Sequence, residues 1–448
     1  MKKRTLAILT GLVTLLGACG AEDPEVPVSD PEVVEEKPQE VNIEYKASEN
    51  SKNLTEGAKT LEAPEKEFSE EQISALSGAS MKLFAEAVKE EGAHPNILLS
   101  PTSISLAFGM TENGAKGETL SQIENVISGG RGIEEMNPLL YDLSARLNAS
   151  KDVRWNVANS IWFKDDGQLK IKEDFAAKAA SWYGADIWNA PFDNTTLKDI
   201  NGWVNAQTHG MIPSILDEIP GDARMFLINA LAFEGEWQVK YEDNDIWENR
   251  SFINADGSIT TVTMLDSTEN RYFRIGDGIG FLKDYKGGEY SFMGLLPEEG
   301  KDLDAFIAEL AAGDEDLAEA IRNCTYDEVI VQIPEFNSDY KLTMNNLLQE
   351  LGMTTAFSEE AADFSEMMES TDGVDYDIFI GNVLHKTHIE VDRKGTRASA
   401  VTSIEMDALG ALPPEYRPVS VILDRPFVYG IIDNQTGLPV FLGCTNSL

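Results

Sequence analysis

A run of mostly small residues, Gly395 to Ser403, constrains the fold of this chain more than any other segment. Side chains of a β-strand alternate between two faces, and one parity of this run is small and uncharged throughout: Thr396, Ala398, Ala400 and Thr402. The segment can therefore lie exposed as a loop, yet also enter the middle of a sheet without overpacking it. An ordinary Ala/Ser-rich surface loop has the same composition. A segment that fits both as an exposed loop and as a strand inside a sheet favours a conformational switch over a catalyst.

The composition predicts a large soluble domain. The chain has 448 residues, of which 42% are hydrophobic, and its seven Trp and nineteen Phe can fill a substantial core. Acidic residues outnumber basic ones by 77 to 36, for a formal charge of −41. A surface this negative repels phosphate backbones, which argues against a nucleic-acid partner and favours a monomer.

The N-terminus has the pattern of an export signal. Lys2, Lys3 and Arg4 precede an apolar stretch over 6–16, which is too short to predict a spanning helix. The sequence Leu-Gly-Ala-Cys over 16–19 resembles the bacterial lipoprotein lipobox. We therefore expect a signal peptide over 1–18 and acyl chains on Cys19, which would anchor an exported protein to the cell envelope, facing the extracytoplasmic space. A plain secretory signal with an incidental cysteine is the alternative.

Residues 19–66 are expected to be a disordered acidic tether, and residues 67–448 a single domain. The stretch 20–66 holds thirteen acidic residues, five lysines, five prolines and one Tyr, with no Phe or Trp. Such a composition buries too little apolar surface to offset its ordering entropy. No second linker and no internal repeat is apparent after residue 67.

Local signals predict a mixture of helices and strands. Ser69 to Gln72 forms a capping box that opens a helix whose buried face carries Ile73, Leu76, Ser80, Leu83 and Ala87. Ser100-Pro101 opens a second helix, which Asn113-Gly114 ends. Strands are expected over 329–333, 418–423, 427–432 and 438–442, and a helix over 342–351.

No catalytic, metal-binding or cofactor-binding motif is present. The sequence lacks H-E-x-x-H, G-x-S-x-G, a phosphate loop and a dinucleotide fingerprint. His385 and His388 would point to opposite faces of a strand, which makes them poor co-ligands. We therefore expect neither an enzyme nor a metal or cofactor. Cys324 and Cys444 are either two buried thiols or one disulfide.

Six blocks, in order, make the chain resemble the serpin family over residues 68–448. In order along the chain, the blocks resemble six parts of a serpin. These are the second helix, the region of the sixth helix, a strand that ends in tryptophan, the strand and helix before the reactive loop, the strand that leads into that loop, and the C-terminal signature. The blocks lie at 96–104, 200–212, 229–237, 333–358, 384–386 and 424–429.

The resemblance implies a mixed α+β fold of three β-sheets and eight or nine helices with an exposed reactive loop. It also implies a suicide-substrate inhibitor. A target serine protease cleaves the loop and remains bound as an acyl-enzyme, while the cleaved loop inserts as a new strand into the central sheet.

The resemblance assigns roles to particular residues. Gly395, Thr396, Ala398, Ala400 and Thr402 would form the hinge, and Trp237 would lie at the breach where the loop first enters the sheet. A polar cluster called the shutter would control the opening of the sheet. Its members would be Ser100, Ser103, Asn229 and His385. Generic capping and core roles are the alternatives for these residues.

In the family, the usual spacing from the hinge glycine to the cleaved bond would place that bond between Leu409 and Gly410. If the register differs by one or a few residues, Ala408 or Met406 would precede the cleaved bond instead. No Arg or Lys lies between Arg397 and Arg417, which favours chymotrypsin-, elastase- or subtilisin-like targets over trypsin-like ones. Arg393 and Arg397 stand where inhibitory hinges of the family usually have acidic residues. Arg397 belongs to the face of the strand that points outward, so its side chain can stay in solvent. A non-inhibitory binding or structural protein, and an inhibitor of a cysteine protease, remain alternatives.

Overall fold

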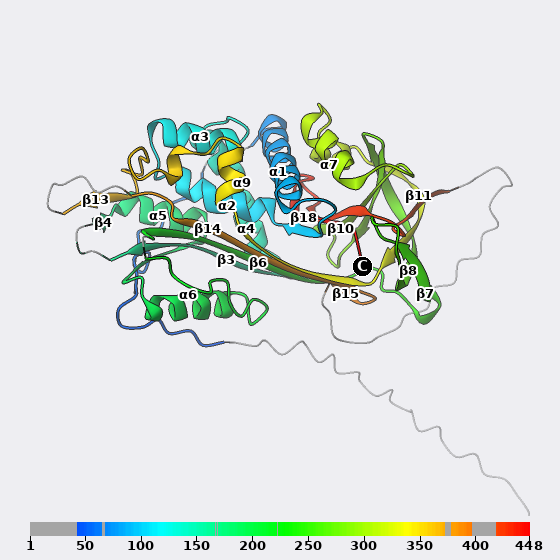
Figure 1. Ribbon diagram of the computed structural model, residues 1–448, viewed down its shortest axis with the longest axis horizontal. Coiled ribbons are helices and arrows are strands. Elements are labelled where there is room, and N and C mark those ends of the chain that lie inside the picture. Colours follow the sequence, from blue (N-terminus) through cyan, green and yellow to red (C-terminus); the bar gives the residue numbers. More distant parts are fainter. Residues whose placement is uncertain are drawn as a thin grey trace, which may run out of the picture. The chain divides into compact units, whose positions relative to one another are not determined.

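The computed structural model describes residues 43–448 except 65–67, 166, 168, 222, 372–377 and 397–417 (Figure 1). The described residues form two large sheets, a two-stranded ribbon and nine α-helices. Within these ranges no helix combines the length and the apolar composition that crossing a bilayer requires.

Sheet A, as we name the seven-stranded sheet, carries the candidate functional site. Its strands, in spatial order, are β1 (Lys52–Asn53), β5 (Asp186–Ala190), β3 (Val153–Lys164), β6 (Met225–Glu236), β15 (Gly395–Thr396), β14 (Asn382–Asp392) and β12 (Phe336–Thr343). The central strands β6 and β14 run parallel and are in register from Asn382 opposite Phe226 to His388 opposite Ala232.

The second large sheet has nine strands and packs at one end of sheet A. Eight follow one another as β16 (Val419–Ile422), β11 (Thr325–Pro334), β8 (Ile259–Ile275), β9 (Gly278–Asp284), β10 (Tyr290–Pro297), β17 (Phe427–Asp433), β18 (Pro439–Thr445) and β2 (Ile97–Leu99), and β7 (Ile246–Ile253) pairs with β8. The long β8 pairs with three other strands of this sheet, β7, β9 and β11. The ribbon consists of β4 (Leu169–Ile171) and β13 (Met368–Ser370).

The helices cover both faces of sheet A. Figure 1 shows α6 below the sheet and α1, α2, α3 and α9 above it. The bounds are α1 (Glu70–Glu91), α2 (Pro101–Glu112), α3 (Gly117–Ile127), α4 (Ile133–Ala149), α5 (Glu173–Trp182), α6 (Asn194–Gln207), α7 (Leu303–Ala312), α8 (Leu317–Arg322) and α9 (Asn345–Glu350). Short 3-10 turns occur at η1 (Asp243–Asp245) and η2 (Thr355–Phe357).

Most local predictions are confirmed. The capping box at Ser69 forms, Ser100 caps α2 with Pro101 in its first turn, and α2 ends at Asn113. The three C-terminal strands lie where we expect them. The helix predicted over 342–351 is shorter, because the paired strand β12 continues to Thr343 and α9 begins only at Asn345.

Residues 43–64 correct the expected tether, because they lie against the domain. Lys52 and Asn53 pair with β5 as the edge strand of sheet A, and Tyr45 packs edge-on against Trp188 at a ring-centroid distance of 6.0 Å. The prediction treated residues 20–66 as one segment with one composition, although residues 43–64 differ from the rest. Residues 43–64 bring apolar and hydrogen-bonding side chains that find partners on α5, α6 and β5. Of the expected disordered tether, 19–42 and 65–66 lie outside the described residues.

Cys324 and Cys444 are buried free thiols, so the disulfide that the sequence left open does not form.

Candidate functional site

The first two residues of the small-residue run already form a strand inside sheet A. Gly395 and Thr396 make up β15, which lies between β6 and β14 and is antiparallel to both (Figure 1). Gly395 is opposite Glu236 on one side and Asp392 on the other. The loop that follows Thr396 therefore starts from within the sheet.

Gly395 is required by a close approach of two backbones. A Cβ atom at this position would lie 2.1 Å from the carbonyl oxygen of Gly235 and 2.8 Å from Cα of Glu236. Both contacts are with backbone, which cannot give way without moving β6. The glycine opens the run because a side chain would push β15 out of the sheet.

Thr396 points into the core. It is fully buried, and its hydroxyl lies 2.6 Å from the hydroxyl of Tyr285. Tyr285 in turn stacks on Trp237, with ring centroids 4.7 Å apart and planes 10° from parallel. The inward parity deduced from the sequence therefore holds at Thr396.

Trp237 holds the turn between β14 and β15. Its indole Nε1 donates to the carbonyl of Asp392 (2.8 Å), and its backbone N donates to the carbonyl of Lys394 (3.1 Å). Within the turn, the Asp392 carboxylate accepts from the backbone N of Lys394 (2.7 Å) and of Gly395 (3.1 Å). Burial raises the pKa of this carboxyl.

Arg393 turns away from β15 and pairs with Glu335, its Nε lying 3.1 Å from the carboxylate. The departure from the family's acidic pattern at this position therefore places no unpaired charge at the hinge.

The four predicted shutter residues lie together on the face of sheet A that α2 covers. His385 Nε2 accepts from the backbone N of Ser100 (3.0 Å), and His385 Nδ1 is 2.6 Å from Oδ1 of Asn229. The amide nitrogen of Asn229 donates to the carbonyl of Ser103 (2.8 Å), and the hydroxyl of Ser100 donates to the carbonyl of Val440 (2.7 Å). The cluster therefore ties β14 and β6 to α2 and β18.

Burial keeps His385 neutral. Desolvation lowers the pKa of its imidazole from 6.5 to about 3. Because Nε2 accepts a hydrogen bond, the single ring proton sits on Nδ1 and is donated to Asn229. His388 has the opposite parity and pairs with Asp339 near the surface, 2.7 Å from its carboxylate, so the two histidines diverge as expected.

Sequence reasoning missed three residues of this site. Asn159 on β3 accepts from Asn229 at 2.6 Å and extends the polar row across a third strand. Tyr285 and Asp392 hold β15 and its turn. Asn159 is one of several polar residues on β3, and nothing local distinguishes it or Tyr285. Ala398, Ala400, Thr402, Leu409, Gly410 and Cys19 lie outside the described residues.

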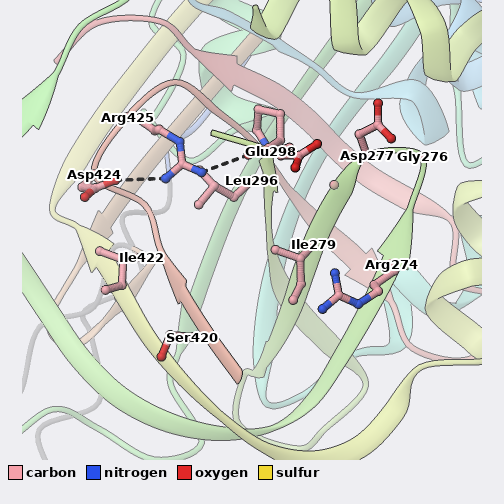
Figure 2. A pocket seen from close by; sticks show the side chains of 12 residues that line it. Arg274, Gly276, Asp277, Ile279, Leu296, Glu298, Ser420, Ile422, Asp424 and Arg425 are labelled. Atoms are coloured by element: carbon pink, nitrogen blue, oxygen red, sulfur yellow. Dashed lines mark hydrogen bonds and ion pairs between the residues drawn. The ribbon is translucent and has the colours of Figure 1, made fainter. Parts of the chain in front are cut away.

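The C-terminal signature has a structural contact of its own. Figure 2 shows Arg425 reaching Asp424 and the end of β10, where it donates to the carbonyl of Pro297 at 3.0 Å. Beside it lies a cavity of about 510 Å³ whose charged lining residues are of both signs: Arg274, Asp277, Glu298, Asp424 and Arg425. Arg425 thereby fixes the chain between β16 and β17.

A family model described as "Serpin (serine protease inhibitor)" matches residues 74–447. With sheet A, its polar shutter and the loop strand in place, this match shows that the chain belongs to the serpin family. Serpins are protease inhibitors, not enzymes.

Curated relatives and solved structures agree. The chain is 30% identical over 374 residues to Serpin-Z4 of Hordeum vulgare, covering 80% of this chain and 92% of that protein. It is 29% identical over 397 residues to Leukocyte elastase inhibitor A of Mus musculus, covering 83% and 98%. The native state of the thermophilic serpin Tengpin superposes with a TM-score of 0.81 at 37% identity, covering 89% and 100%. The expected three-sheet serpin fold is confirmed.

Proposed function

We propose that this serpin is a suicide-substrate inhibitor of serine endopeptidases. The carrying observation is the position of β15. The hinge enters sheet A between β6 and β14, the two strands that an inserting loop must separate.

The inserted strand would continue the direction that β15 begins. Because Thr396 faces the core, strand periodicity would put Ala398, Ala400 and Thr402 of an inserted strand on the same inward face. Insertion would form a new set of ladder hydrogen bonds with both neighbours, which supplies its driving force.

The covalent step is an interrupted proteolysis. The serine Oγ of the protease attacks the carbonyl carbon of Leu409, the bond to Gly410 breaks, and the new amine of Gly410 takes the proton. The acyl-enzyme ester to Leu409 then travels with the inserting strand. Water completes hydrolysis only if it reaches the ester before insertion distorts the protease.

The residues around the proposed bond favour proteases with apolar specificity pockets. Leu409 and the register alternatives Ala408 and Met406 are apolar, and the segment 398–416 contains no Arg or Lys. Targets of chymotrypsin, elastase or subtilisin type fit this sequence. The signal sequence and Cys19 support action at the outer surface of a cell envelope, where a lipid anchor would hold the inhibitor.

Mixing the protein with each of the three proteases tests the proposal. We expect a band at the summed mass that survives boiling in denaturing gels, with a released peptide that begins at Gly410. Ala398→Arg places a charge on the inward face and should convert the inhibitor into a cleaved substrate. Ser399→Arg, one residue later and outward, should keep the complex.

Clean cleavage without a complex for the unaltered protein, against all three proteases, would overturn the proposal. A complex with a cysteine protease instead would identify the other class of target. No rise in thermal stability after loop cleavage would favour a non-inhibitory binding protein.

A further inference from the structure

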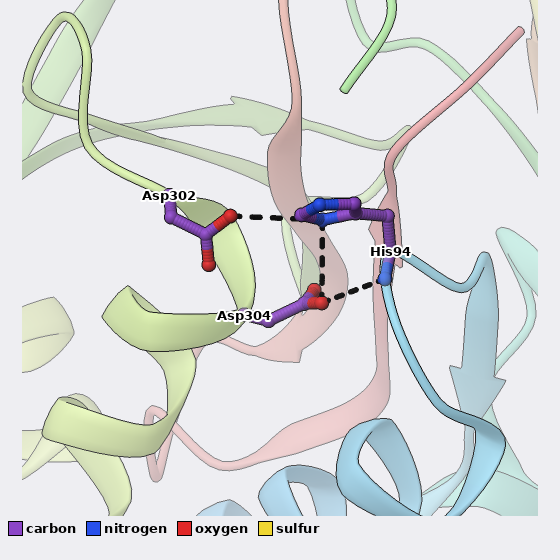
Figure 3. A group of neighbouring side chains, drawn as sticks. All are labelled: His94, Asp302 and Asp304. Carbon is purple, nitrogen blue, oxygen red and sulfur yellow. Dashed lines mark hydrogen bonds and ion pairs between the residues drawn. The ribbon is translucent and has the colours of Figure 1, made fainter. Parts of the chain in front are cut away.

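We propose that His94, Asp302 and Asp304 form a divalent-metal site that selects Zn²⁺. The three side chains are separate from the polar row between sheet A and α2. His94 belongs to the turn between α1 and β2, and the two aspartates flank the first residue of α7 (Figure 3).

The distances from the imidazole to the two carboxylates fit a tetrahedral zinc ion, and all three ligand atoms lie within 4.8 Å of one another. His94 Nδ1 lies 3.4 Å from Oδ2 of Asp304 and 3.6 Å from Oδ2 of Asp302. Ligand atoms at about 2.0–2.2 Å from a tetrahedral Zn²⁺ are separated by about 3.3–3.6 Å. Both distances exceed the ordinary range of about 2.7–3.2 Å for N–H···O bonds. The imidazole therefore faces two carboxylates at ligand spacing rather than at hydrogen-bond spacing.

Both carboxylates are held in place by a second contact. Asp302 caps α7, its Oδ1 accepting from the backbone N of Ala305 at 2.9 Å. Asp304 accepts from the amide of Asn446 at 3.2 Å and from the backbone N of His94 at 2.7 Å. Such outer contacts fix ligand orientation before the metal arrives.

The surroundings admit a cation. The side chains of His94 and Asp302 are 41% and 50% exposed, and that of Asp304 is 22% exposed, so an ion can enter from solvent and a water can complete the fourth position. Lys301, next to Asp302 in sequence, is directed to Asp277 and Glu309. One imidazole with two carboxylates suits Zn²⁺, whereas Ca²⁺ and Mg²⁺ need six or more oxygen ligands.

The chain offers two variants that remove ligands and keep local structure. His94 has a φ of 55°, a conformation that asparagine tolerates, so His94→Asn preserves the turn. Asp302→Asn keeps a helix N-cap while removing the charge. His388→Asn is the matched control, because His388 faces a single carboxylate, that of Asp339.

Isothermal titration of Zn²⁺ into the chelator-stripped full chain tests the site. We expect one equivalent to bind, with an affinity about 100-fold weaker in His94→Asn and at least about 10-fold weaker in Asp302→Asn. His388→Asn should bind like the unaltered chain. X-ray absorption of the complex should show an N/O-only shell with one imidazole. Absence of one-equivalent binding, or equal affinity in His94→Asn, would overturn the proposal.

Discussion

The hydroxyl of Thr396 lies 2.6 Å from that of Tyr285, so the first inward residue of the small-residue run is hydrogen-bonded inside the core. This bond and the Trp237 contacts to the preceding turn hold the hinge. In the proposed mechanism, these contacts connect the loop to the two strands that it would have to separate.

Tyr285→Phe should loosen the hinge. It leaves the buried Thr396 hydroxyl without its partner, at a cost of about 1–3 kcal/mol in the free energy of unfolding. Adding Thr396→Val removes the orphaned hydroxyl and should recover part of that loss. Denaturant unfolding of the two single variants and the double variant measures the coupling. Strict additivity of the two effects would contradict it.

Gly395→Ala should expel β15 from sheet A. Its Cβ would lie 2.1 Å from the carbonyl oxygen of Gly235. Hydrogen exchange should show loss of protection at Thr396, and the fluorescence of Trp237 should change because its turn contacts move. Gly221→Ala is the control, since a Cβ there meets nothing within 4 Å. Retained protection in Gly395→Ala would refute the close-approach argument.

His385 should make stability depend on acidity. Its folded pKa of about 3 lies below the ordinary 6.5, so its contribution is complete above pH 6.5 and is lost as the pH falls from 6.5 towards 3. At pH 5 the loss from this residue is about 2 kcal/mol. Unfolding at pH 7.5 and 5.0 should show a smaller difference for His385→Gln than for the unaltered chain.

Glu112→Gln should stabilise the protein near neutrality. Glu112 is fully buried, its Oε2 lacks a hydrogen-bond partner, and burial raises its pKa well above 4.5. The wild-type stability from this group is therefore complete below pH 4.5 and declines as the pH rises. Relative to wild type, the variant should gain about 1–3 kcal/mol at pH 7.5 and nothing at pH 4. Glu134→Gln, whose side chain is 81% exposed, is the control.

Asp199→Ala should release residues 43–64. Its carboxylate accepts from the backbone N of Ser48 at 3.1 Å and from the hydroxyls of Ser48 and Ser51, each at 2.6 Å. Limited trypsin digestion should then cut this segment at its lysines faster than in the unaltered protein. Asp174→Asn, at an exposed position, should digest like the wild type. Equal rates in Asp199→Ala would mean that the remaining contacts, such as the β1 pairing and the packing of Tyr45 on Trp188, hold the segment without Asp199.

The sequence predicted the serpin fold and much of the site because local signals and block order agreed. Caps at Ser69 and Ser100 fix two helix starts through a few neighbouring residues, which composition and spacing reveal. The polar row was recognised at Asn229 and His385 from the resemblance alone. Their contact depends on the parallel register of β6 and β14, strands separated by more than a hundred residues.

What the sequence did not reveal depends on long-range packing. Tyr285 acts on the hinge only because β9 ends beside Trp237. Residues 43–64 are ordered by partners such as Asp199 and Trp188, which lie far along the chain. The amino-acid composition of a segment carries no information about such distant partners. The sequence therefore predicted a solvated tether for residues 43–64.

The seven-residue register between β14 and β6 has a kinetic consequence. From Asn382 to His388 the two strands pair with each other directly. The short strand β15 separates them only at the other end of β14. In the proposed insertion, these pairs would have to separate one after another, and the hydrogen bond between His385 and Asn229 lies partway along them. The rate at which β6 and β14 separate, compared with the rate at which water hydrolyses the acyl-enzyme ester, would decide whether a protease is trapped or released.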